Sequence, residues 1–219
     1  SIIIFFLNEK IKTYIIITSI SLIFAFYIFE AYLSFKQVES VNYVKKKQLN
    51  KKIKLYKQKT GKNYETSTLF EFYNDLKKKD EDIVVTLSSS NYNLNSSKIF
   101  PLSGISNSKT IYCNENGYYA IYQSDRYGFN NPDIEWDKRE IEYLLLGDSF
   151  AHGGCVNRPY DIASVLRILS NRAVLNLGNR GNGPLIEYVS LREYIKPNIK
   201  NILWLYYEGN DLSDLKKEL

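Results

Sequence analysis

Residues 141–153 read IEYLLLGDSFAHG, an apolar run that stops at Gly147 and continues with Asp148 and Ser149. A short, continuous apolar run bounded by glycine is typical of a strand buried on both faces of a sheet. The serine therefore stands where a buried strand ends and the chain must turn. Its hydroxyl suits two roles, a cap for the next helix or a nucleophile exposed at the edge of the sheet.

The residues after this strand alternate between helix and strand patterns. Two further apolar stretches suit strands, and two stretches suit helices, the second with proline in its first turn. This alternation predicts an α/β fold with a parallel sheet and flanking helices, whose right-handed crossovers bring the carboxyl ends of the strands to one edge. The expected elements are strand 141–147, helix 161–169, strand 173–178, helix 184–195 and strand 201–207.

Three loops follow these strands, at the edge where open α/β sheets bind ligands. They are Gly147–Ser149, Asn176–Pro184 and Glu208–Asp211. The first supplies a serine hydroxyl, and the glycines of the second let a backbone N–H approach a ligand closely. The third supplies the side-chain amide of Asn210, a neutral donor suited to a developing oxyanion. Together the loops offer a nucleophile and donors for acyl transfer.

The blocks GDSFAHG, NLGNRGNG and EGND resemble, in this order, the first three blocks of the SGNH (GDSL-like) hydrolase superfamily. The resemblance covers residues 141–215 and implies a three-layer, flavodoxin-like SGNH hydrolase fold. It makes Ser149 the nucleophile, Gly181 the residue whose amide lines the oxyanion hole, and Asn210 the side-chain oxyanion donor. Residues 113–133 also resemble the lead-in of a membrane-anchored bacterial subset, a segment to which the sequence gives no chemical role.

The resemblance implies a serine esterase, acyl hydrolase or acyltransferase that needs no metal and no organic cofactor. Its substrate would carry an acetyl or other short acyl ester on a small molecule, a lipid or a carbohydrate. Ser149 would attack the ester carbonyl, and the acyl-enzyme would pass its acyl group to water or to another hydroxyl.

The general base of this family, a histidine in an Asp-x-x-His block, has no counterpart in the chain. The single histidine, His152, follows Ser149 by three residues, and we expect it to line the site or support the fold. Asp148 and Asp211 are interpreted as structural carboxylates that hold turn amides. Because the chain contains no methionine, starts at Ser1 and ends soon after the third block, we expect the natural protein to extend further and to carry the base.

Other interpretations remain open on the sequence alone. A catalytically inactive SGNH-like module would bind surface glycan or an assembly partner. A flavodoxin-like redox or nucleotide-binding domain would share the sheet, but GDSFAHG lacks both the Gly-x-Gly-x-x-Gly and the phosphate-loop pattern. Ser149 and Asn210 also suit helix caps, and Gly178, Gly181 and Gly183 suit a tight turn.

The N-terminal part of the chain has a different composition. Residues 13–35 contain a single charge, Glu30, and a helix of this length crosses a hydrocarbon core of about 30 Å. We therefore expect a transmembrane anchor in residues 1–36, in preference to a cleavable signal peptide or a buried core helix. The lysine-rich residues 37–65 form a juxtamembrane segment with most of the net charge of +5, which leaves no footprint for nucleic-acid binding elsewhere.

Two signals disagree about the orientation in the membrane. The lysines after the span favour a cytoplasmic domain by the positive-inside rule. Cys113 and Cys155 suit a disulfide in an oxidising compartment, the alternative being two unpaired buried thiols. We expect a single-pass protein whose catalytic domain lies on the periplasmic or extracytoplasmic side.

The rest of the chain is divided into a small α/β lead-in region, residues 66–139, and an SGNH hydrolase-like domain, residues 140–219. The lead-in region is expected to start with an amphipathic helix capped by Thr66 or Ser67 and to contain a hairpin around Gly117. Its expected elements are helix 66–79, strand 82–88, a Ser/Asn-rich loop 88–98 with a sequon at Asn95, and hairpin 110–132.

Overall fold

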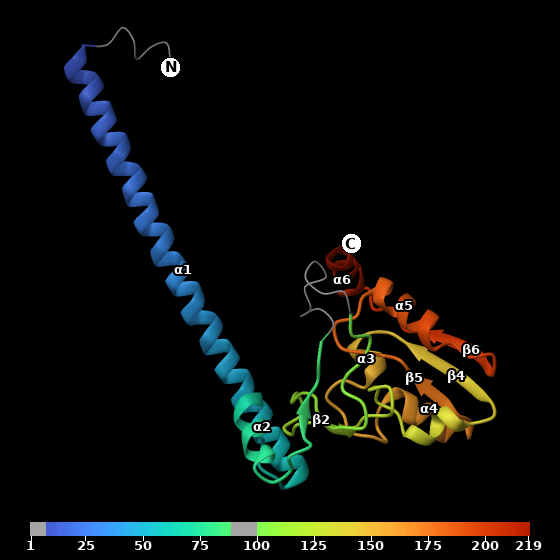
Figure 1. Ribbon diagram of the computed structural model, residues 1–219. Coiled ribbons are helices and arrows are strands. Elements are labelled where there is room, and N and C mark those ends of the chain that lie inside the picture. The colour runs from blue at the N-terminus through green and yellow to red at the C-terminus, as the bar shows by residue number, and fades with distance from the viewer. Residues whose placement is uncertain (1–7, 89–99) are drawn as a thin grey trace. The chain divides into compact units, whose positions relative to one another are not determined.

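The computed structural model describes residues 8–88 and 100–219, which divide into two compact units between Lys62 and Asn63. The first unit is one long helix, and the second is a mixed α/β unit with two small sheets (Figure 1). The expected loop 88–98, apart from Ser88, and its sequon lie outside the described residues.

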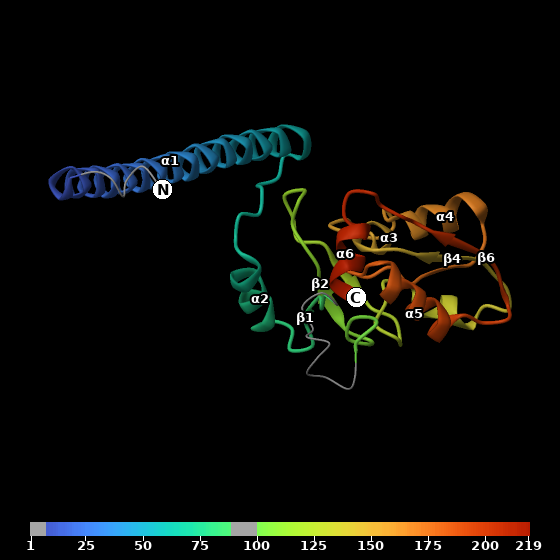
Figure 2. The ribbon, with the colours of Figure 1, turned by 90° about the horizontal axis from the view of Figure 1, so that it is seen from above.

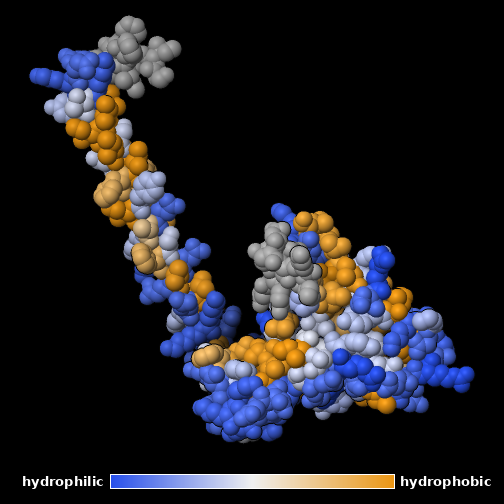
Figure 3. Space-filling view, in the orientation of Figure 1, coloured by the Kyte–Doolittle hydropathy of each residue, from blue (hydrophilic) through white to orange (hydrophobic). Residues whose placement is uncertain are grey.

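Helix α1 (Glu9–Thr60) covers 52 residues, none of them buried. It starts after Asn8, whose side chain accepts a hydrogen bond from the backbone of Lys10, and ends at Gly61 in the left-handed conformation. By length and composition it can cross a membrane, and Figure 3 shows apolar side chains along its N-terminal half. The helix continues without a break into the lysine-rich segment and ends within it, at Thr60.

A three-stranded parallel sheet forms the centre of the second unit. Its strands are β4 (Ile141–Leu146), β5 (Val174–Asn176) and β6 (Ile199–Trp204), and β4 lies between the other two. Helices α4 (Ile162–Ser170) and α5 (Pro184–Tyr194) lie on opposite sides of β4 (Figure 2). The expected parallel sheet with flanking helices is confirmed.

Apolar side chains pack on both faces of this sheet because successive residues of a strand point to opposite sides. The cluster that includes a residue of α5 contains Leu144, Leu146, Leu175 and Leu191. The cluster that includes residues of α4 contains Leu145, Val174, Ala163 and Leu166. Strands β4 and β5 are thus buried on both faces, as their composition predicts.

Strand β6 differs from the expected strand 201–207 in its bounds and in its burial. Pairing with β4 begins at Ile199, opposite Ile141, and ends at Trp204. Beyond Trp204 the chain turns, because the Tyr207 N–H donates to the carboxylate of Asp211. Among the described residues β6 pairs with β4 alone, which leaves Trp204 45% exposed. A strand buried on both faces was the wrong expectation here.

Helix α2 (Leu69–Lys77) is capped by Thr68, so the expected caps Thr66 and Ser67 were wrong. The Thr68 hydroxyl accepts from the backbone of Glu71, and the Glu71 carboxylate accepts from the backbone of Thr68. This reciprocal pair is a capping box, which satisfies two free donors at the start of the helix. Ser67 instead donates its backbone N–H to the side chain of Glu65.

A second small sheet lies in the lead-in region. Its strand β1 (Val84–Val85) is shorter than the expected strand 82–88 and runs parallel to β2 (Lys109–Ile111). Strand β2 pairs antiparallel with β3 (Ile121–Gln123), which confirms the expected hairpin. Gly117, in the connection, has a φ of +90°, a conformation that glycine adopts without steric cost.

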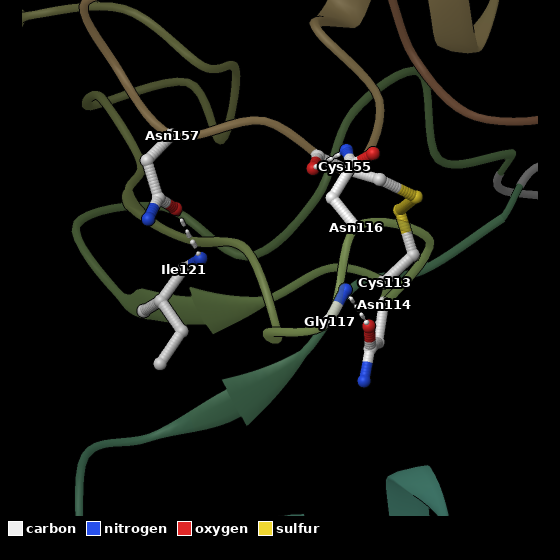
Figure 4. Close-up of a disulfide and its surroundings, with 7 residues drawn as sticks. All are labelled: Cys113, Asn114, Asn116, Gly117, Ile121, Cys155 and Asn157. Carbon is white, nitrogen blue, oxygen red and sulfur yellow. Dashed lines mark hydrogen bonds between the residues drawn. A yellow bond between two sulfur atoms is a disulfide. The ribbon is translucent and has the colours of Figure 1, made fainter. Parts of the chain in front are cut away.

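The two cysteines form a disulfide, so the alternative of two free thiols was wrong. The bond joins Cys113, two residues beyond β2, to Cys155 in the loop after α3 (Ser149–His152) (Figure 4). Disulfides persist in extracellular, periplasmic and other oxidising compartments. The second unit therefore has the chemistry of an extracytoplasmic domain.

Candidate functional site

Ser149 stands at the carboxyl end of the central strand, as the first residue of α3. Gly147 has a φ of +146°, and a Cβ there would lie 2.9 Å from the carbonyl oxygen of Leu205, so the turn requires glycine. The helix cap is Asp148, whose side chain accepts from the Phe150 N–H at 2.8 Å. The Ser149 hydroxyl is therefore not the capping group, and in the described part of the chain it makes no hydrogen bond.

A pocket of about 390 Å³ opens at Ser149. Its walls come from three segments, namely the connection between β2 and β3, the stretch from α3 to the start of α4, and the loop after β5. Tyr112, Cys113 and Glu115 belong to the first, Ser149, Phe150, Gly153–Val156 and Tyr160–Ile162 to the second, and Arg180 to the third. The lead-in region, which has no predicted chemical role, thus supplies one wall of the pocket.

Asn210 joins the third loop to the first. It precedes α6 (Asp211–Glu218), and its side chain does not cap that helix. Its Nδ2 group lies 3.0 Å from a carboxylate oxygen of Asp148 and 3.0 Å from one of Asp214. Both amide hydrogens are thereby directed at carboxylates, and one of these bonds must be given up before Asn210 donates to an oxyanion.

The loop after β5 meets α3 at close range. A Cβ on Gly178 would lie 2.4 Å from the backbone nitrogen of His152, so this contact requires glycine. The Asn179 N–H donates to the Gly147 carbonyl at 3.3 Å. Gly181 follows Arg180 of the pocket wall with a φ of +76°, but it does not itself line the described pocket. The three loops after the strands therefore meet around Asp148 and Ser149, with Gly181 one residue from the wall.

His152 is buried behind the pocket and is 2% exposed. Its ring stacks on Tyr112 at 4.3 Å between centroids and meets the edge of Tyr122 at 4.9 Å. Neither ring nitrogen has a hydrogen-bond partner among the described residues, and burial lowers the pKa of His152 from 6.5 to about 3. The imidazole is neutral at physiological pH and supports the fold.

The carboxylates Asp148 and Asp211 hold turn amides, as interpreted from the sequence. Asp148 accepts from the Phe150 N–H, and Asp211 accepts from the Tyr207 N–H. Burial raises the pKa of Asp211 above its usual value, and the nearby charge of Asp148 adds to this effect.

Glu187, on α5, is a buried carboxyl that sequence reasoning missed. It is fully buried and accepts a hydrogen bond from the indole N–H of Trp204. Burial raises the pKa of Glu187 from 4.5 to about 7, with the charges of Asp211 and Asp148 adding to the effect. A glutamate in the first turns of a helix is usually an exposed residue that interacts favourably with the helix dipole. The sequence therefore gives no sign that Glu187 is buried.

The pocket residues Tyr112, Tyr160 and Arg180 were also missed. The Arg180 guanidinium lies 6.0 Å above the ring of Tyr112, across the pocket wall. The described residues contain no group of three His, Cys, Asp or Glu side chains arranged to hold a metal ion.

No family model matches the chain, and no curated protein or solved structure matches it either. The likeness to SGNH hydrolases therefore rests on the three sequence blocks.

Proposed function

We propose that the chain is a membrane-anchored serine esterase, acyl hydrolase or acyltransferase with an SGNH-type, three-layer domain. The observation that carries this proposal is the position of Ser149. It follows the central strand of a parallel sheet, leaves the capping role to Asp148, and faces a pocket. The other two loops that follow parallel strands meet it at the same edge, where ligand sites of such sheets form.

In this proposal the Ser149 oxygen attacks the carbonyl carbon of an ester. The resulting oxyanion accepts hydrogen bonds from the backbone N–H groups of Ser149 and Gly181 and from the amide of Asn210. The alcohol then leaves with a proton, and the acyl group passes from Ser149 to water or to another hydroxyl. A general base takes the hydroxyl proton of Ser149 during the attack and returns it to the departing alcohol. The described residues place no such base against Ser149.

The same proposal anchors the protein through α1 as a single membrane span. The disulfide supports a periplasmic or extracytoplasmic position for the second unit. The substrate is then an ester on a small molecule, lipid or carbohydrate that is accessible from that side.

The test uses the natural full-length protein in detergent, a fluorophosphonate probe and p-nitrophenyl esters of short acids. We expect labelling and ester hydrolysis by the wild type, and a loss of at least about 1000-fold in both for Ser149→Ala. Ser213→Ala, which removes the same oxygen from an exposed position of α6, is the matched control. An unlabelled wild type, or equal labelling of Ser149→Ala, would contradict the proposal.

The inactive binding module is the second candidate. It is favoured by the two carboxylates that engage the Asn210 amide. It predicts that the wild type resists the probe and hydrolyses no ester, while glycan fragments still perturb the fluorescence of residues in the pocket. Labelling of Ser149 would rule this candidate out.

A further inference from the structure

The connection between β2 and β3 is fastened to the loop that follows α3. Two residues beyond β2, Cys113 forms the disulfide with Cys155. Beside it, the Asn116 side chain donates to the Cys155 carbonyl at 3.1 Å (Figure 4). Farther along, the Ile121 N–H donates to the side chain of Asn157 at 2.9 Å. Three links thus hold one short segment, residues 155–157, against the hairpin.

The end of α3 is held by the same region. The His152 ring packs between Tyr112 and Tyr122, and the Asn130 side chain donates to the His152 carbonyl at 2.9 Å. Both contacts are buried. Helix α3 is a single turn, so its own backbone hydrogen bonds are too few to fix its direction. Its orientation depends on these contacts from the lead-in region.

The fastened loop touches Ser149 directly. The Gly154 N–H donates to the Ser149 carbonyl at 2.8 Å, and a Cβ on Gly154 would lie 2.9 Å from that oxygen. Cys155, the next residue, has a φ of +58°, a conformation that is costly for residues other than glycine. A movement of Cys155 therefore changes the backbone that carries the Ser149 side chain.

We propose that the β2–β3 hairpin, fastened by the Cys113–Cys155 disulfide, positions Ser149 for reaction and that reduction of this bond switches the site off. The inference rests on the proposed function, since it concerns the reactivity of Ser149. Cys113 and Cys155 also line the pocket, so the bond sets the shape of the wall as well as the direction of α3. Displacement of a reacting group by about 1 Å is enough to lower a rate about 100-fold.

The first experiment reduces the folded full chain with dithiothreitol. Each disulfide becomes two thiols, and the reagent is oxidised to its cyclic disulfide. The chain contains only these two cysteines, so the reagent changes nothing else. We expect the rate of fluorophosphonate labelling at Ser149 to fall at least 10-fold with unchanged far-UV circular dichroism, and to return on reoxidation with oxidised glutathione.

The second experiment leaves the disulfide in place. Asn116→Ala removes the hydrogen bond to the Cys155 carbonyl, and we expect a three- to tenfold fall in labelling rate, with a larger effect on kcat than on KM for ester hydrolysis. The matched control is Asn198→Ala. Its side chain donates to the Lys138 carbonyl at 3.0 Å, ahead of β6 and at the opposite end of the sheet from Ser149. This control should keep the wild-type rate.

The outcomes separate the two proposals. If the oxidised wild type is not labelled, the proposed function fails, and this inference fails with it. If the wild type is labelled and the reduced protein and Asn116→Ala react at the same rate, the hydrolase stands and the positioning role is overturned. A lower melting temperature with an unchanged labelling rate would identify a stabilising cross-link only. If reduction unfolds the protein, the labelling rates of Asn116→Ala and Asn198→Ala are compared instead. Equal rates would overturn the positioning role, and a slower rate for Asn116→Ala alone would support it.

Discussion

Glu187 is a buried carboxyl whose raised pKa makes the stability of the fold depend on pH. Its carboxyl titrates with a pKa of about 7 in the fold, against 4.5 in an exposed position. Below about pH 4.5 the group is protonated in the folded and the unfolded chain alike. As the pH rises towards 7 the unfolded chain ionises first, so stability falls across this window and stays lower above it.

Glu187→Gln should abolish this slope, because the neutral amide still accepts from the indole of Trp204. At pH 8 the variant should gain roughly 2–3 kcal/mol in the free energy of unfolding, and at pH 4 almost nothing. Urea denaturation of the full chain at both pH values measures the difference. Glu193→Gln, on an exposed face of the same helix, serves as the control, and an equal gain for both variants would contradict the assignment.

The side-chain amide of Asn210 lies between two carboxylates and donates a hydrogen bond to each, Asp148 and Asp214. Asn210→Asp places a third carboxylate there and should cost about 1–3 kcal/mol in stability at pH 7. The repulsion raises the folded-state pKa of the group, so the deficit should shrink as the pH falls through that raised pKa and should be almost absent below about 4. Thermal unfolding at pH 3.5 and 7 measures this. Asn171→Asp, an exposed residue in a left-handed turn, should show no such dependence.

At the scale of elements, the contact between the β5 loop and α3 depends on the absence of one methyl group. Gly178→Ala places a Cβ 2.4 Å from the His152 nitrogen and 2.7 Å from the Ala151 carbonyl carbon. Neither backbone atom moves without shifting α3, so we expect a loss of about 1–3 kcal/mol. Unfolding of the second unit in urea measures it. Gly61→Ala strains a left-handed residue with a φ of +70°, but Gly61 belongs to the first unit, so that variant should leave the transition of the second unit unchanged.

The elements that the sequence predicted well have signals within their own residues. Strand β4 is a continuous apolar run, and α5 starts at Pro184. The cap of α2 had a local signal too, since Thr68 and Glu71 form the capping-box spacing, but the earlier Thr66 and Ser67 were preferred. Strand β6 was misplaced because its start depends on pairing with β4, which no local pattern reports.

The candidate site likewise combines features that the local sequence predicts with contacts between distant residues that it does not predict. Ser149 was predictable because the end of its strand is marked by Gly147. The bond between Asn210 and Asp148 joins residues 62 positions apart, and the bond between Asn116 and Cys155 joins residues 39 positions apart. Such contacts follow from packing of the whole unit, which is why the wall formed by the hairpin and the engagement of the Asn210 amide were not foreseen.

For the whole molecule, the proposed topology makes a prediction about cells. The full chain should remain with membranes after an alkaline carbonate wash, since α1 offers more apolar length than a bilayer core requires. Protease added to the outer face of sealed cytoplasmic membranes should digest the second unit. Protection of that unit until the membrane is lysed would place the domain in the cytoplasm. A variant without residues 1–62 provides the control for release by the wash.

The redox state of Cys113 and Cys155 also reports the compartment in which the second unit has folded. If the proposed topology holds, a chain inserted in the opposite orientation would leave its second unit in a reducing compartment, where Cys113 and Cys155 stay as thiols. The hairpin and the loop after α3 would then be joined by non-covalent contacts alone, and such molecules would open and be proteolysed first. Proteolysis would thus remove molecules inserted in the opposite orientation. The cross-linked molecules that remain would be those whose second unit had reached an oxidising compartment.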